Sequence, residues 1–143
     1  MATKLIYCPG LSTTAVNYRG ILIEESLEDR GVLNRLKIIE TKISQVTPRH
    51  KTPWLKQWTL DTVEIDEALI ESVSKTISLA IDREHRGSWF ADFLNDKNHY
   101  VIFYNKVFLI DRRNKSNYDE AVKYGLSIGI PAHQLDFSDD LIS

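Results

Sequence analysis

Residues 99–111, HYVIFYNKVFLID, carry the clearest β signal in the chain. Two runs rich in β-branched and aromatic residues flank Asn105-Lys106, and a two-residue turn at that dipeptide predicts a β-hairpin. In this register Phe103 lies opposite Phe108 on one face, and Ile102 lies opposite Leu109 on the other. Both faces of the hairpin are then apolar, so each of them needs a covering layer.

Helices elsewhere in the chain can supply these layers. The sequence predicts them at about residues 14–30, 62–83, 88–95 and 117–128. The second is the best defined, because apolar residues recur every three or four positions from Ile65 to Ile81. Asp61 and Glu64 also have the spacing of a capping box at its start. Three to four helices packed on a sheet would bury both faces of the hairpin.

A further strand is predicted between the first two helices. Residues 36–46 alternate in the manner of a strand, although neither face is cleanly apolar. Residues 47–61 are not assigned, but the alternation from Trp58 to Ile65 also fits a strand. The sequence therefore predicts an α+β fold with a mixed or antiparallel sheet.

Length and composition favour one domain. The chain has 143 residues, of which 43% are hydrophobic and 27% charged, enough for one globular core. It contains no internal repeat, low-complexity tract or flexible linker. We therefore expect residues 1–143 to form a single α+β domain.

Charge and hydropathy argue against nucleic-acid and membrane partners. Eighteen Lys and Arg residues against twenty Asp and Glu give a net charge of −2, so no overall basic field exists. No apolar run approaches the roughly 18 residues of a membrane span, and the N-terminus lacks a signal-peptide core. The single cysteine cannot form an internal disulfide, which agrees with a reducing compartment. These features predict a cytoplasmic protein.

Several short motifs resemble one group of proteins. They are WFADF at 89–93, VIFYNKVF at 101–108, YGLSIGIP at 124–131 and QLDF at 134–137, with a weaker echo in YCPG at 7–10. With these motifs the last third to half of the chain resembles a family of small uncharacterised proteins from lactobacilli and related Gram-positive bacteria. The resemblance implies a cytosolic bacterial setting. No activity is known for the family, so the resemblance assigns no catalytic residue.

Residues 8–14, CPGLSTT, form the most ligand-like corner of the sequence. A strand that turns directly into a helix aims unpaired backbone N–H groups and the positive end of the helix dipole at a ligand. The candidate residues for binding a small anion are Cys8, Gly10, Ser12, Thr13 and Thr14. They lack the spacing of a P-loop or a dinucleotide-binding loop. Capping a helix is the commoner role of such hydroxyls.

Glu40-Thr41-Lys42 matches one half of a magnesium-dependent nuclease site. On a strand, Glu40 and Lys42 would share a face, where the carboxylate binds Mg²⁺ and the lysine stabilises charge. The preceding segment offers no strand aspartate, so Glu24 or Glu25 would have to complete the metal site. A solvated ion pair is the commoner explanation of this tripeptide.

Two further clusters carry weaker hypotheses. Zinc could be held by His85, Asp92, Asp96 and His99 only if two loops brought them together. Basic residues surround the hairpin aromatics, as in sheets that stack nucleic-acid bases; they are Lys106, Arg112, Arg113, Lys115 and Lys123. Acidic neighbours dilute that charge, and the apolar flanks favour a buried core. We therefore expect no metal site and no nucleic-acid partner.

No set of residues in the sequence brings a nucleophile, a base and an orienting group together. The leading hypothesis is a non-catalytic protein without a cofactor that acts through protein contacts, including self-association as a homodimer. One alternative is a magnesium-dependent, nuclease-like enzyme that uses Glu40 and Lys42. The other is binding of a small anion at residues 8–14.

Overall fold

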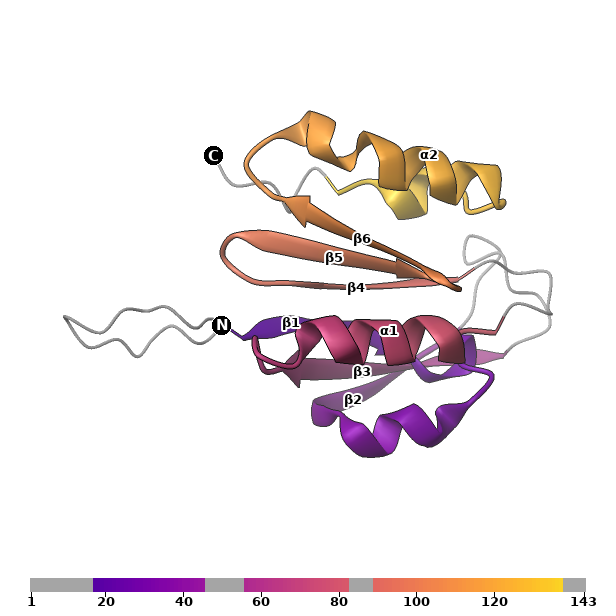
Figure 1. The fold of residues 1–143 in the computed structure, drawn as a ribbon. Helices are drawn as coiled ribbons and strands as arrows, with labels where there is room; N and C mark the ends of the chain where they lie inside the picture. The colour runs from indigo at the N-terminus through magenta and orange to yellow at the C-terminus, as the bar shows by residue number, and fades with distance from the viewer. Residues whose placement is uncertain (1–16, 46–55, 83–88, 138–143) are drawn as a thin grey trace, which may run out of the picture.

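Six antiparallel strands form one sheet in the order β2-β3-β1-β4-β5-β6 (Figure 1). The computed structural model describes residues 17–45, 56–82 and 89–137. Its strands are β1 (Tyr18–Ile23), β2 (Lys37–Gln45), β3 (Gln57–Ile65), β4 (Phe90–Leu94), β5 (Asn98–Phe103) and β6 (Lys106–Asp111). Its α-helices are α1 (Ile70–Ala80) and α2 (Asp119–Ser127). The 3₁₀ turns η1 (Glu24–Ser26), η2 (Arg30–Arg35), η4 (Lys115–Tyr118) and η5 (Ala132–Leu135) complete the described elements. The predicted α+β class is therefore confirmed.

Strands β5 and β6 confirm the predicted hairpin but correct its register. The turn lies one residue earlier than expected, at Tyr104-Asn105, and Phe103 pairs with Lys106. Asn105 has a positive φ of 55°, a conformation that asparagine tolerates better than most residues, and this fixes the turn position. The change of register is two residues, so Phe103 and Phe108 still share a face, with ring centroids 5.8 Å apart.

The first predicted helix, at about 14–30, is wrong where the structure describes it. Residues 18–23 form the strand β1, which lies between β3 and β4, and the two turns η1 and η2 follow. Tyr18 and Leu22 are buried on one face while Ile21 is 51% exposed on the other, which is the alternation of a strand. Residues 14–16 lie outside the described part of the chain.

Two other helix predictions are also corrected. The helix expected at 62–83 begins only at Ile70, because residues up to Ile65 continue strand β3. The segment expected to be a helix at 88–95 is the strand β4 where it is described. The predicted strand at 36–46 is confirmed as β2, and the helix predicted at 117–128 is confirmed as α2.

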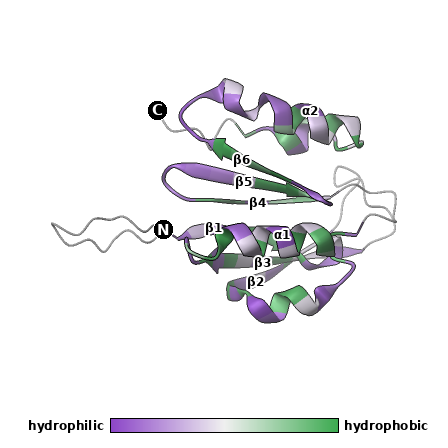
Figure 2. Cartoon of the chain, in the orientation of Figure 1, coloured by the Kyte–Doolittle hydropathy of each residue, from purple (hydrophilic) through white to green (hydrophobic). Residues whose placement is uncertain are grey.

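Strand β5 is buried on both of its faces, as the apolar hairpin predicted. The cluster on the α1 side includes Tyr18, Leu22, Val63, Ile77, Phe93 and Ile102. The cluster on the α2 side includes Val101, Phe103, Ile110, Tyr118, Leu135 and Phe137. Strands β4 to β6 lie between the two helices in Figure 1, and Figure 2 shows hydrophobic residues along these strands.

Helix α1 is fixed to the sheet by one buried serine. Ser78 Oγ donates to the carbonyl of Phe103 at 2.6 Å and accepts the N–H of Lys106 at 3.0 Å. These two bonds satisfy backbone groups at the turn end of the β5–β6 hairpin. None of the helices in residues 17–45, 56–82 and 89–137 is long and apolar enough to span a membrane.

Candidate functional site

A groove of about 440 Å³ lies beside the α2 layer, on the same face of the sheet. Its lining comes from β1, β2, β3, β4 and η5 and consists of Ile21, Ile23, Ser44, Trp58, Leu60, Trp89, Phe90, Asp92, His133 and Gln134. Small-molecule sites typically enclose about 300–1,000 Å³ with an apolar lining and a few polar groups. The groove has this size and this mixture of residues.

The apolar floor of the groove follows from strand register. Ile21 of β1 lies directly opposite Asp92 of β4, and Ile23 lies opposite Leu60 of β3. Directly opposite residues point to the same face, so these side chains gather on one surface. Trp58 and Trp89 also line the groove, and their ring centroids lie 5.5 Å apart.

Asp92 is the charged group of the groove, and a buried histidine holds it in place. Its Oδ2 lies 2.7 Å from Nε2 of His99, which is fully buried, while 31% of the Asp92 side chain remains exposed. On the other side of the ring, Nδ1 of His99 lies 3.0 Å from the Tyr118 hydroxyl. The chain of contacts Asp92–His99–Tyr118 thus connects the groove to the core under α2.

Aromatic rings pack around His99 and Tyr118. Phe137 lies edge-on to His99 at 5.3 Å and stacks on Tyr118 at the same centroid distance. A buried imidazole that is held by rings and by two hydrogen bonds has one orientation. Nε2 of His99 therefore faces Asp92.

A pair of carboxyl groups, Asp61 and Glu24, lies away from the groove, on the opposite face of the sheet. Asp61 of β3 is fully buried, and its Oδ1 accepts a hydrogen bond from Thr41 at 2.6 Å. A hydrogen bond between Asp61 and Glu24, followed by burial, raises the pKa of Glu24 to about 7. A carboxyl group beside a second, buried carboxylate keeps its proton to higher pH, so Glu24 is partly protonated near neutral pH.

Glu40 and Lys42 do not join these carboxylates. Glu40 Oε2 lies 3.7 Å from Lys42 Nζ, and the two side chains are 56% and 69% exposed. Thr41 points toward Asp61, so its neighbours Glu40 and Lys42 point to the other face of the sheet. Within the described ranges no three His, Cys, Asp or Glu side chains gather to hold a metal ion. The magnesium-dependent hypothesis gains no support from this geometry.

The remaining predicted site residues separate in the fold. Of the imagined zinc set, Asp92 and His99 meet, Asp96 lies exposed in the β4–β5 turn, and His85 is outside the described residues. The candidate anion site, Cys8, Gly10, Ser12, Thr13 and Thr14, also lies outside them.

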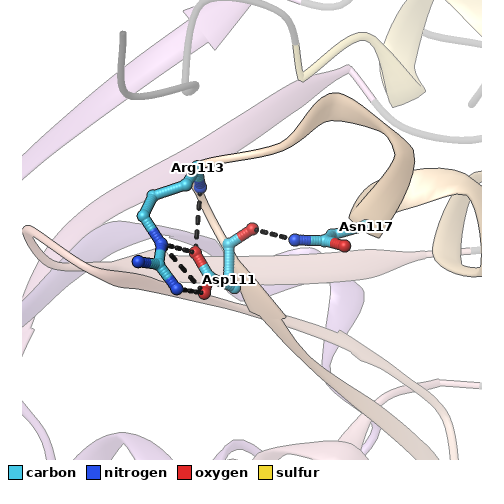
Figure 3. A network of polar contacts seen from close by, with 3 residues as sticks. All are labelled: Asp111, Arg113 and Asn117. Atoms are coloured by element: carbon cyan, nitrogen blue, oxygen red, sulfur yellow. Dashed lines mark hydrogen bonds and ion pairs between the residues drawn. The ribbon is translucent and has the colours of Figure 1, made fainter.

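Two of the aromatic residues of the hairpin are buried and do not lie exposed beside its basic residues. Tyr100 and Phe103 are buried, and Lys106 lies over the ring of Phe108, 5.3 Å from its centroid. Arg113 is bound to Asp111 through its backbone N–H and its guanidinium, and Asn117 donates to the Asp111 carbonyl (Figure 3). The Arg113 side-chain hydrogen bond lowers the pKa of Asp111 to about 2. These aromatic side chains pack the core instead of facing a basic groove.

The contact between Asp92 and His99 was not predicted from the sequence. Asn95 offered a signal for a turn, since asparagine favours tight turns. In the structure its Oδ1 accepts the N–H groups of Lys97 and Asn98 at 2.9 Å, in the turn between β4 and β5. A helix assigned to 88–95 hides this hairpin, and with it the pairing that brings residue 92 close to residue 99.

Comparison with known proteins adds no assignment. No protein-family model, curated protein or solved structure matches the chain. The resemblance to small proteins of lactobacilli therefore stays a prediction from the sequence motifs.

Proposed function

We propose that this chain is a binding protein whose groove takes a small molecule with an apolar body and a cationic amine at one end. The apolar body would lie on Ile21, Ile23 and Leu60. The amine would bind the carboxylate of Asp92. Binding without reaction is the simplest proposal for a groove whose described lining is mostly apolar.

The observation that carries the proposal is the carboxylate of Asp92 in an apolar surface, held from behind by His99. The two ring nitrogens of His99 are taken up by Asp92 and by the Tyr118 hydroxyl. The Asp92 carboxylate stays 31% exposed and lines the groove, where a cationic group of a ligand can reach it. A hydrogen bond to a charged group is about twice as strong as a neutral one, which gives the groove its selectivity.

Binding can be measured with three probes that differ only in their end group. The probes are 4-phenylbutylamine, 4-phenylbutanol and 4-phenylbutyrate, titrated against the ¹⁵N-labelled protein by NMR. We expect the amine to bind with a dissociation constant on the order of 1 mM, as suits a fragment of this size, and to shift the amide signals of Ile21 and Leu60. The alcohol should bind more weakly and the carboxylate least, because Asp92 repels it.

A charge-removing variant and a matched control complete the test. Asp92→Asn should weaken binding of the amine about tenfold and leave binding of the alcohol unchanged. Asp96→Asn removes the same charge from an exposed turn outside the groove and should have no effect. Equal binding of the amine and the carboxylate, or shifts confined to other parts of the molecule, would rule the proposal out.

Other functions predicted from the sequence stay predictions. Action through a protein partner is favoured by one specific surface, the outer edge of β2. Binding of a small anion at residues 8–14 is supported by no described contact. Cytoplasmic location also rests on the sequence alone.

A further inference from the structure

Strand β2 forms an open edge of the sheet. It pairs with β3 on one side, and no other strand of the described residues pairs with it. Eight of its nine residues are exposed, including Ile39 at 44% and Ile43 at 54%. An exposed edge strand presents unpaired N–H and C=O groups, which makes it a template for another strand.

The sequence of β2 is complementary to itself when two copies run antiparallel. Thr41 is the midpoint of the nine residues Lys37–Gln45, so a twofold axis at Thr41 aligns the strand with its copy. Around this axis Glu40 lies opposite Lys42 of the second copy, and Lys42 lies opposite Glu40. Ile39 and Ile43 lie opposite each other in the same way on the other face.

Other registers lack this match. In an antiparallel pair, residues that lie directly opposite each other point to the same face of the sheet. A twofold axis perpendicular to the sheet must therefore pass between two copies of the same residue. An axis through Lys42 would place Glu40 opposite Ser44, and an axis through Glu40 would place Lys42 opposite Ile38. Both leave the charges of the strand without opposite charges across the interface.

One feature of β2 limits the length of the pairing. The pairing with β3 shifts between Ile38 and Glu40, which makes Ile39 the extra residue of a β-bulge. Bulges and lysines commonly protect edge strands from unwanted pairing. In β2 the bulge lies at one end of residues 39–43, which carry the complementary pattern, so it leaves most of that pattern in place. Lys42 lies opposite the Glu40 carboxylate of the second copy, so its charge favours this pairing.

From these observations we propose that two copies of this chain associate through β2, edge to edge and antiparallel, with Thr41 on the twofold axis. The two sheets then continue as one sheet across the dimer. The proposal does not depend on what the groove binds. Because a single strand pair buries a small area, the dimer should be weak and should depend on protein concentration.

Sedimentation velocity of the full chain and its charge variants tests this register. Wild-type protein should form a dimer as its concentration is raised to about 500 μM. Glu40→Lys places like charges opposite each other twice in the dimer, and so does Lys42→Glu, so each should weaken association by about tenfold or more. The double variant Glu40→Lys/Lys42→Glu restores opposite charges and should dimerise like the wild type.

A matched control comes from helix α1. Lys75 and Glu71 form an exposed ion pair with the same N–O distance of 3.7 Å, so Lys75→Glu makes the same charge change away from the edge. This control should dimerise like the wild type. A wild-type protein that stays monomeric, single variants that still dimerise, or a double variant that does not recover would each overturn the proposal.

Discussion

Replacing Gly20 with alanine should lower the free energy of unfolding by about 3 kcal/mol or more. Gly20 lies in the middle of β1, between β3 and β4. A Cβ atom there would lie 1.9 Å from the carbonyl oxygen of Asp92 and 2.7 Å from the ring of Phe93. The nearer of these is backbone, so only separation of β1 from β4 can relieve the overlap. Denaturant unfolding followed by circular dichroism measures the loss.

Gly125→Ala is the matched control for this prediction. Its Cβ would lie 2.8 Å from Leu135, but the contacting atoms are the ends of a flexible side chain that can move. Alanine also favours the helical backbone of α2 over glycine by up to about 1 kcal/mol. We therefore expect a net change within about 1 kcal/mol. Equal stability of the two variants would contradict the close approach of β1 and β4, and with it the floor of the groove.

The free energy of unfolding should fall by about 2 kcal/mol as pH rises from about 5 to 8, because of Glu24. The pKa of Glu24 is raised from its ordinary value of 4.5 to about 7 in the folded protein, first by its hydrogen bond with Asp61. Between these two values the folded state holds a proton that the unfolded state has released. The stabilising contribution is therefore complete below about pH 4.5 and is lost as pH rises through about 7.

Asp61→Asn isolates this effect from the titration of the histidines. The asparagine amide can donate to the Glu24 carboxylate, and its carbonyl oxygen can still accept from Thr41. Glu24 then ionises without repulsion, so the variant should be more stable than the wild type at pH 8. The difference should shrink toward pH 5. Parallel stability curves of the two proteins over this range would contradict the raised pKa of Glu24.

Local sequence predicted the elements that carry a strong pattern. The 99–111 hairpin is apolar on both faces, and this pattern correctly predicted the burial of strand β5. It was wrong for part of β6, where Leu109 is 58% exposed. Strand β1 escaped prediction because its six residues contain Gly20, which a strand interior disfavours. Its strand form depends on pairing with β3 and β4, which are distant in sequence. The helical spacing of apolar residues across 14–30 arose without an α-helix in residues 17–30, the part that the structure describes.

The groove could not be predicted because it depends on register between five elements. Ile21 meets Asp92 only through the pairing of β1 with β4, and Leu60 meets Ile23 only through the pairing of β3 with β1. Strand β4 has only five residues, which is too short for periodicity to separate a strand from a helix. Only the tight turn at Asn95 offered a local signal that Asp92 and His99 face each other.

The position of a bound amine tests most directly the claim that Asp92 is the cation-binding group of the groove. A crystal structure of the protein with 4-phenylbutylamine measures it. We predict the amine nitrogen within hydrogen-bond distance of an Asp92 carboxylate oxygen, with the phenyl ring on Ile21, Ile23 and Leu60. An amine that binds away from Asp92, or outside the groove, would contradict the account.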